Sequence, residues 1–519
     1  MDRARAALAD LTALDRTALE ALIVAQQSEL SAQQEKLLSR DSEIEHLKLV
    51  IAKLRRMMFG TKSEKVAREI EQLELKLEEL EVRQAERERA TSTDTPAKNK
   101  PTRRPLPEHL PREVHTHLPQ EDACSQCGGE LRKLGEDVSE MLEYVPASFK
   151  VIRHIRPKLS CTKCDVIVEA PAPSRPIERG LAGPGLLAHV LVSKYADHLP
   201  LYRQSEIYAR AGVDLDRSTL ADWVGAASCL LTPLVNKVRD HVLAASKLHA
   251  DDTPVPVLAP GMGRTKTGRL WTYVRDDRSA GEQDPPAVWF AYSEDRKGEH
   301  PRQHLSKFSG ILQADGYAGF HHLYDGGRIV EAACWAHVRR KFYDIHVTTG
   351  SAIAAEAIER IGFLYDIERG IRGKPTGLRC ETREARARPL VDDLHRWFHR
   401  TLAGLSRKSD AAMAIRYALS RWRALTRYLD DGCIEMDNSA AERALRTVAL
   451  GRKNYLFAGS DAGGERAAAI YTLLGTAKLN GIDPELYLRQ VLKRIADYPV
   501  NRVHELLPWN LAAPPTHLP

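Results

Sequence analysis

The segments KLHADD at residues 247–252 and GILQAD at residues 310–315 decide the fold, because each is a short strand-like run that ends in acidic residues. Two further strand candidates, residues 270–274 and 287–292, lie between them and are joined by polar turns that contain glycine and proline. Turns of this kind are typical of hairpins, so we expect three hairpin-connected strands before the strand that ends at Asp315.

The remaining elements of this region complete a recognisable order. A helical segment at residues 300–308 precedes the fourth strand, and a fifth strand at 329–334 leads into a helix that begins at Trp335. Three strands, helix, strand, helix, strand, helix is the element order of the ribonuclease-H fold. We therefore predict a multidomain α/β protein with a ribonuclease-H-like catalytic core at residues 245–460, which contains a helical insertion at about 351–430.

The acidic ends of the first and fourth strands are candidate metal ligands. In the predicted fold these two strand ends lie side by side, which brings Asp315 next to Asp251 or Asp252. Adjacent carboxylates without a basic partner repel each other, and a bound divalent cation is the usual resolution. Oxygen ligands with open coordination positions favour Mg2+ or Mn2+.

A third acid is expected where the sequence DNSAAER (437–443) opens a predicted helix, with Asn438 or Ser439 as its cap. Glu442 then falls in the first turn of that helix. Each of the three acids, taken singly, is more typical of a solvated surface carboxylate. Their joint placement is what favours a catalytic centre.

Two CxxC pairs indicate a metal site of another kind, in a domain expected at residues 120–175. Four thiolates in a chain with few cysteines suit a closed tetrahedral Zn2+ site, whereas a redox dithiol or buried free cysteines are the alternatives. The 33 residues between the pairs require a long hairpin, which includes the strand-like stretch 151–159. The four candidate ligands are Cys124, Cys127, Cys161 and Cys164.

Residues 1–90 are predicted to be helical almost throughout. Apolar residues recur at every seventh position from Ile23 to Met58, and the pattern resumes after an interruption at Gly60. Such a repeat is typical of a coiled coil with a break. A helical hairpin that folds back on its own chain is the alternative to a dimer.

The next segments are candidates for contact with DNA. Residues 91–119 form a proline-rich, basic linker that is expected to be extended and solvated, or to touch phosphate. Its basic residues are Lys98, Lys100, Arg103 and Arg104. Residues 176–244 are predicted to be helical, and the pattern around Gly212 is compatible with a helix-turn-helix, although any helical hairpin has the same pattern. Residues 461–519 are expected to form a C-terminal helical element.

Composition limits the classes of protein to which this chain can belong. The 519 residues carry a net charge of +6, which permits a nucleic-acid partner without demonstrating one. Apolar runs stay short of the ~20 residues that a membrane-spanning helix needs, and the N-terminal residues lack the pattern of a secretory signal. Eight cysteines are too few for a disulfide scaffold. These features predict a cytoplasmic protein that does not associate with a membrane.

The motifs together resemble a known family, the large transposase protein of the insertion sequence 66 group in the Asp-Asp-Glu transposase superfamily. The matching stretches are MFGTKSE (58–64), the two CxxC pairs, HADDTPV (249–255), TGRLW (267–271), LQADGY (312–317), CWAHVRRKF (334–342) and DNSAAER (437–443). One departure is visible, because the family usually has a glutamate where this chain has Asp252. The family's catalytic aspartate matches Asp251, so the resemblance favours Asp251 over Asp252 as the metal ligand.

The resemblance implies an enzyme that cuts the ends of its own mobile element and joins them to target DNA. Asp251, Asp315 and Glu442 would hold two Mg2+ (or Mn2+) ions that activate water, and later the freed 3′-hydroxyl, for in-line attack on a phosphodiester. A covalent protein–DNA intermediate is not required.

The same resemblance implies several partners. Double-stranded DNA would be bound at the element's terminal inverted repeats and at the target, by a homodimer or a larger complex, and small accessory proteins of the element are possible partners. The candidate phosphate contacts in the catalytic region are His337, Arg339, Arg340 and Arg443, for which a solvated helix face is the alternative.

Two other functions compete with this interpretation. A DNA-binding regulator would contain a coiled coil, a zinc domain and a helix-turn-helix, but it would have no use for three clustered acids. A ribonuclease-H-like nuclease would cut DNA without joining it. The sequence does not separate cutting from joining.

Overall fold

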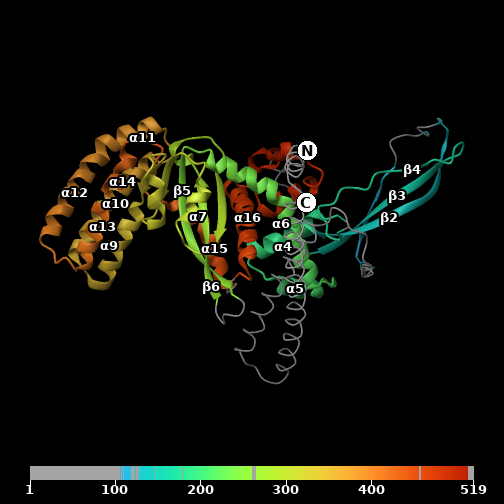
Figure 1. Cartoon of the computed structure of the whole chain (residues 1–519), viewed down its shortest axis with the longest axis horizontal. Coiled ribbons are helices and arrows are strands. Elements are labelled where there is room, and N and C mark those ends of the chain that lie inside the picture. The colour runs from blue at the N-terminus through green and yellow to red at the C-terminus, as the bar shows by residue number, and fades with distance from the viewer. Residues whose placement is uncertain are drawn as a thin grey trace, which may run out of the picture. The chain divides into compact units, whose positions relative to one another are not determined.

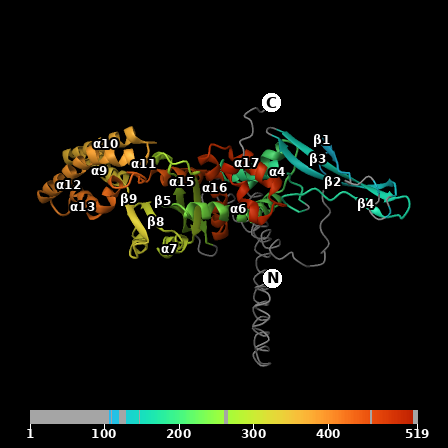
Figure 2. The ribbon, with the colours of Figure 1, turned by 90° about the horizontal axis from the view of Figure 1, so that it is seen from above.

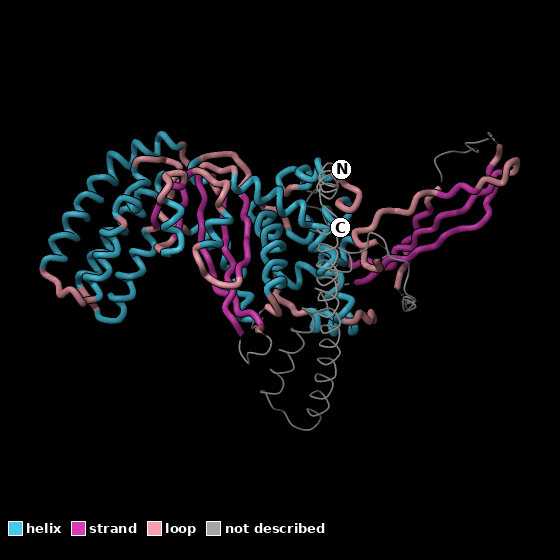
Figure 3. Tube along the Cα trace, viewed as in Figure 1, coloured by secondary structure: helices cyan, strands magenta, loops and turns pink. Residues whose placement is uncertain are grey.

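A computed structural model of the chain describes residues 106–511, apart from short gaps. The gaps are residues 107, 109, 119–122, 124–126, 128, 146–147, 179, 260–264 and 455–457. The predicted coiled coil at residues 1–90 therefore lies outside the described residues, as do Cys124 and the basic linker residues Lys98, Lys100, Arg103 and Arg104. Within the described residues the protein is mixed α/β with two separate sheets (Figure 3).

The first sheet is built on a long antiparallel hairpin of β2 (Leu131–Val145) and β3 (Ser148–Cys161). This confirms the long hairpin that the spacing of the cysteines predicted. The short strand β4 (Ile167–Glu169) pairs with β3, which also pairs in parallel with β1 (Arg112–Thr116). β1 lies within the predicted linker; it is extended and mostly exposed, and it pairs with β3 over five residue pairs.

Three helices follow, in the region predicted to be helical. They are α4 (Pro184–Tyr195), α5 (Leu201–Arg210) and α6 (Arg217–Leu243). Gly212 has a φ of 78°, a left-handed conformation that glycine adopts without strain, and it turns the chain between α5 and α6. The expected helical hairpin is present, but its second helix is 27 residues long and buries Leu220 among other apolar residues. Helix α6 is apolar enough to pass a membrane-span criterion, yet 61% of its most apolar window is buried in the protein.

The second sheet has the strand order β7-β6-β5-β8-β9. Strand β5 pairs antiparallel with β6 and parallel with β8, while β6–β7 is antiparallel and β8–β9 is parallel. All five predicted strands are present. Their bounds are Lys247–Leu258 for β5, Thr265–Arg275 for β6, Ala287–Ser293 for β7, Gly310–Ala314 for β8 and Ile329–Ala333 for β9.

Strand β5 differs from the prediction because it does not end at the acids. It continues to Leu258 through its pairing with β6, whereas its pairing with β8 stops at His249, opposite Gln313. Asp251 therefore lies within a strand, just beyond the last residue that pairs with β8. Asp315 directly follows β8, so both acids still lie at the same end of the β5–β8 pair.

Helices on either side of this sheet belong to two apolar cores. The first core joins the sheet to α6 and to the C-terminal helices α16 (Asp461–Leu479) and α17 (Pro484–Arg494). Helix α16 contacts both α6 and β7, and α16 and α6 lie close together in both views (Figure 1, Figure 2). The hydroxyls of Thr472 and Thr476 accept hydrogen bonds from backbone N–H groups of β7, which covers the exposed edge of that strand.

The second core belongs to the predicted helical insertion, coloured orange in Figure 1. It packs Trp335 and Phe342 against apolar residues of the insertion, including Phe398. Its main helices are α9 (Trp335–Thr349), α10 (Ala352–Ile371), α11 (Thr376–Thr382), α12 (Arg388–Ala403), α13 (Asp410–Ser420) and α14 (Trp422–Thr426). After the insertion the chain returns to the sheet as α15 (Ser439–Asn454), which contacts β5 and β6.

Candidate active site

The carboxyl group of Asp251 is the electrostatic centre of the site. Its pKa is raised to about 7, mainly by burial and also by the nearby carboxylates of Asp315, Asp252 and Glu442, against a hydrogen bond that its Oδ1 accepts from the Asp252 backbone at 2.8 Å. Among the described residues, no lysine or arginine pairs with Asp251. The structure therefore brings the three predicted acids close enough to repel one another.

The side chain of Asp252 points to the opposite face of β5 from that of Asp251, because successive side chains of a strand alternate between the two faces of a sheet. Its carboxylate is fully buried and accepts hydrogen bonds from Arg269 at 2.9 Å and from Arg296 at 2.8 Å. Two guanidinium groups neutralise this carboxylate and occupy its oxygens. The geometry thus favours Asp251 over Asp252 as a metal ligand.

Asp315 sits where β8 ends and the chain turns. Its Oδ1 accepts a hydrogen bond from the Tyr317 backbone at 3.0 Å, and its Oδ2 lies 3.9 Å from the guanidinium of Arg296. Arg421, at the start of α14, donates to the Asp315 carbonyl at 3.4 Å and to the carboxylate of Glu331 on β9. The insertion therefore helps to fix the turn that carries this acid.

Glu442 is positioned by the residue that precedes α15. The side chain of Asn438 is buried, and its Nδ2 donates to the Ala250 carbonyl at 2.8 Å. Its Oδ1 must then accept, and it lies 3.1 Å from Nδ1 of His249. Glu442 does lie in the first turn of α15, as predicted.

The predicted cap needs a correction, because the Asn438 side chain serves as a clamp between α15 and β5. The carboxylate of Asp437 instead accepts the first free N–H of the helix, that of Ser439, at 3.0 Å.

A second clamp holds the loop before α15 against β8. The side-chain amide of Gln313 donates to the carbonyls of Glu435 at 2.5 Å and Asp437 at 2.9 Å, and Gln313 is fully buried. The strand pattern did not single out Gln313 or His249 as site residues. A signal was available, because each is a polar residue in an apolar strand, two positions before a candidate catalytic aspartate.

Basic and sulfur-containing groups flank Glu442. His337 Nε2 lies 3.9 Å from Glu442 Oε1, and the side chain of Cys334 is close to both. Burial raises the pKa of the Cys334 thiol to about 12, so this sulfur stays protonated and accepts the Asn438 backbone N–H. Arg339 and Arg340 on α9 are exposed.

Arg443 follows Glu442 on α15 and is also exposed, so it is free to meet a ligand.

The donor set of the three acids fits a hard divalent cation. Asp251, Asp315 and Glu442 supply oxygen atoms, and their mutual repulsion is the electrostatic condition that a bound cation relieves. The elements that carry them are a central strand, the end of its parallel neighbour and the first turn of a helix.

The predicted zinc ligands form a cluster at the far end of the β2–β3 hairpin from the tight turn. The sulfur of Cys127 lies 3.3 Å from the sulfurs of both Cys161 and Cys164. The Lys163 backbone N–H lowers the pKa of the Cys161 thiol to about 6, which favours the thiolate that zinc binds. Three of the four predicted ligands are thus together, and the donor set fits structural zinc.

We expect about one zinc per chain, because a fourth thiolate from Cys124 would complete a closed tetrahedral site. Cys161→Ser should lose this zinc and lower the thermal stability of the hairpin region, whereas Cys229→Ser, at an exposed position, should keep both. Elemental analysis of protein purified without chelator measures the zinc. A zinc-free wild-type protein that is folded would rule the site out.

Comparisons with known proteins identify four matching family models along the chain. The model described as the transposase IS66 family matches residues 179–466, and the zinc-finger binding domain of transposase IS66 matches residues 121–165. The model described as transposase C of IS166 homeodomain matches residues 46–114, and the IS66 C-terminal element matches residues 472–509.

Full-length relatives are also found in Sinorhizobium fredii. The uncharacterized protein y4hP is 43% identical over 488 residues, which cover 89% of this chain and 88% of the relative. The uncharacterized protein y4qI is 39% identical over 524 residues, which cover 96% of this chain and 97% of the relative.

Proposed function

This chain belongs to the IS66 family of transposases, and on that premise we propose that it is a metal-dependent Asp-Asp-Glu transposase. It would cut DNA at the ends of its insertion sequence in the bacterial cytoplasm and join the ends to target DNA. Asp251, Asp315 and Glu442 would be its catalytic residues.

The topology of the second sheet supports a ribonuclease-H-like core. Three antiparallel strands followed by two parallel ones, in the order β7-β6-β5-β8-β9, place the first and fourth strands side by side. In that fold the junction between these two strands carries the catalytic carboxylates. Asp251 and Asp315 lie at this junction, and α15 brings Glu442 to it.

The observation that carries the proposal is the contrast between two neighbouring aspartates. Asp252 is neutralised by two arginines, whereas the pKa of Asp251 is raised to about 7 by burial and by the other acids. A protein retains uncompensated clustered charge at a cost in stability, and such costs concentrate at functional sites. A cation-binding centre accounts for this cost, and a DNA-binding regulator does not.

The residues of the site would have different roles. Mg2+ ions bound here would supply Lewis-acid activation of the attacking oxygen and stabilisation of the leaving oxygen. Asp251 on β5, Asp315 at the end of the neighbouring strand β8 and Glu442 in the first turn of α15 would hold the metal. His337 lies beside Glu442, where its imidazole can hold a phosphate oxygen or a proton.

Arg339, Arg340 and Arg443 are exposed nearby and would contact DNA phosphates, as would the linker residues Lys98, Lys100, Arg103 and Arg104.

A strand-transfer assay tests the proposed function. The substrate is a labelled duplex that carries the terminal repeat flanking the coding sequence, incubated with the full chain, Mg2+ and a target plasmid. We expect nicking at the repeat end, a free 3′-hydroxyl and labelled plasmid, all abolished by EDTA. Cutting without labelled plasmid would indicate a nuclease, and binding without cutting would indicate a regulator.

Assembly on DNA gives a separate prediction. Joining two ends requires at least two active sites, so we propose a homodimer or larger complex to which the heptads at residues 23–58 contribute. A chain that lacks residues 1–90 should self-associate more weakly in analytical ultracentrifugation. Full self-association by the truncated chain would indicate that the helices form an intramolecular hairpin. Small accessory proteins of the element remain proposed partners.

A further inference from the structure

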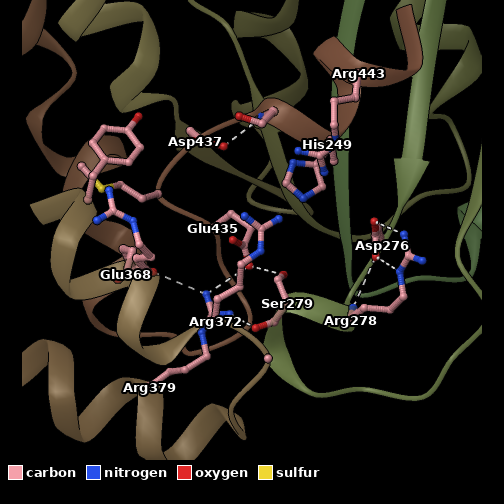
Figure 4. Close-up of a pocket in the computed structure, with 16 residues that line it drawn as sticks. His249, Asp276, Arg278, Ser279, Glu368, Arg372, Arg379, Glu435, Asp437 and Arg443 are labelled. Carbon is pink, nitrogen blue, oxygen red and sulfur yellow. Dashed lines mark hydrogen bonds and ion pairs between the residues drawn. The ribbon is translucent and has the colours of Figure 1, made fainter. Parts of the chain in front are cut away.

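A cavity of about 660 Å3 lies beside the acid cluster, where the sheet meets the helical insertion. Its wall is formed by β5, the β6–β7 connection, the end of α10, α11 and the start of α15 (Figure 4). Its volume falls in the range of about 300–1,000 Å3 that is typical of small-molecule sites. The residues that matter for its chemistry are His249, Tyr365, Arg372, Arg379, Ala440 and Arg443.

Apart from Asp437, the acidic residues of the wall are already neutralised by arginines. Arg379 pairs with Glu435 at 3.0 Å, and Arg383 binds Glu368 through two hydrogen bonds of 2.7 Å. Asp276 is held in the same way by Arg278, at 2.8 Å through two nitrogens (Figure 4). These carboxylates therefore do not oppose an anionic ligand with their full charge.

Two arginines of the wall have no acidic partner among the described residues. Arg372 is exposed at the end of α10, and Arg443 is exposed in the second turn of α15. Guanidinium groups without partners, next to the N-terminal end of a 16-residue helix, make the cavity attractive to a phosphate.

His249 provides an independent sign of a missing ligand. Its side chain is 1% exposed, and its Nε2 has no hydrogen-bond partner among the described residues although the ring forms part of the cavity wall. Because Nδ1 donates its proton to Oδ1 of Asn438, Nε2 of the neutral imidazole is a hydrogen-bond acceptor.

The cavity adjoins the proposed catalytic centre through two elements. His249 precedes Asp251 by two residues on the same face of β5, a separation of roughly 7 Å along a strand. Arg443 directly follows Glu442 on α15. A ligand in the cavity is therefore placed about one nucleotide from a phosphodiester held by the acids.

We propose that this cavity binds one unstacked nucleotide of the DNA end, next to the bond that the acid centre cuts. Its phosphate lies against Arg372 and Arg443, and a base N–H group donates to Nε2 of His249. Tyr365 in the wall offers a ring surface for the base. This inference rests on the proposed function, because it takes the DNA end as the substrate.

The test places 2-aminopurine, whose fluorescence rises when a base is unstacked, at each position near the cut in the terminal-repeat duplex. The full chain carries Asp315→Asn, so that binding is observed without cutting. We expect the 2-aminopurine fluorescence to rise at one position. Adding Arg372→Ala should lower the affinity for the duplex, measured from this rise in fluorescence, by about tenfold. Arg386→Ala, an exposed arginine of the same insertion outside the cavity wall, should leave the rise unchanged.

A second variant fills the cavity without changing its charge. Ala440→Trp should abolish the rise, and a thermal melt will show whether this variant is folded; if it is not, Arg372→Ala alone decides. The absence of a rise at every position, or a rise that Arg372→Ala leaves unchanged, would overturn the inference. Tight binding of free deoxynucleoside monophosphates with no rise on DNA would also overturn it, in favour of a free nucleotide.

Failure of this inference is distinguishable from failure of the proposed function. A wild-type chain that cuts and joins DNA without a fluorescence rise refutes the nucleotide cavity only. A wild-type chain that binds the terminal repeat but neither cuts nor joins refutes the proposed function, whatever the fluorescence shows.

Discussion

Asp315→Asn should abolish cleavage and joining while the chain still binds the terminal repeat. Asparagine has nearly the shape of aspartate but lacks the charge that holds a divalent cation, so the hydrogen bond from the Tyr317 backbone can persist. Asp251→Asn and Glu442→Gln remove the other two ligands in the same way. Each change should lower the rate of strand transfer by roughly a thousandfold or more, as expected for groups that act in the transition state.

The three losses should not add, because the acids act as one unit. A double variant should therefore be about as inactive as either single variant. Asp325→Asn and Glu465→Gln, at exposed positions, are matched controls that should leave activity unchanged. Fluorescence anisotropy with the labelled repeat measures binding. A triad variant that loses binding together with activity would indicate a structural role instead.

Asp251→Asn and Asp252→Asn should have opposite effects on stability although the residues are neighbours. Asp252→Asn leaves Arg269 and Arg296 facing a neutral group, which should lower the free energy of unfolding by about 3 kcal/mol. Asp251→Asn removes a carboxylate that the folded state disfavours, which should raise the free energy of unfolding at pH 8 in metal-free buffer. Urea denaturation of the two variants measures both changes.

The pH dependence follows from the raised pKa of Asp251. A carboxyl whose pKa is about 7 when folded and near 3.8 when unfolded binds more protons in the folded state between these values. Its contribution to stability is therefore lost as the pH rises through that window, by up to about 4 kcal/mol above pH 7. In Asp251→Asn the free energy of unfolding should depend less on pH in this window. In the wild type with Mg2+, the free energy of unfolding should rise with pH instead of falling. Equal pH profiles for wild type and Asp251→Asn would show that Asp251 is not buried among other acids.

Short local motifs were enough to predict the five strands and the three acids. Polar residues at strand ends, such as Asp315, stand out because they interrupt apolar runs. The sequence 437–443 predicts a helix start, which places Glu442 in the first turn. The length of β5 was not predictable in this way, because the strand continues past Asp252 only through its pairing with β6.

The supporting contacts depend on tertiary structure. Asn438 or Ser439 is predicted to cap the following helix, which is the local preference of both residue types, but the Asn438 side chain binds the Ala250 carbonyl and the His249 ring of β5. The strand pattern alone could not choose between Asp251 and Asp252, and only the family resemblance favoured Asp251. Arg269 and Arg296 lie 17 and 44 residues from Asp252, and only the folded sheet shows which aspartate they neutralise.

The central claim is that Asp251, Asp315 and Glu442 together hold the metal that drives strand transfer. Its most direct test is the metal preference of Asp315→Cys, because a thiolate ligand binds Mg2+ poorly and accepts softer ions such as Mn2+ better. Strand transfer by this variant should be absent with Mg2+ and should partly return with Mn2+, while the wild type uses both. Near-normal strand transfer with Mg2+ by Asp315→Cys would contradict the claim.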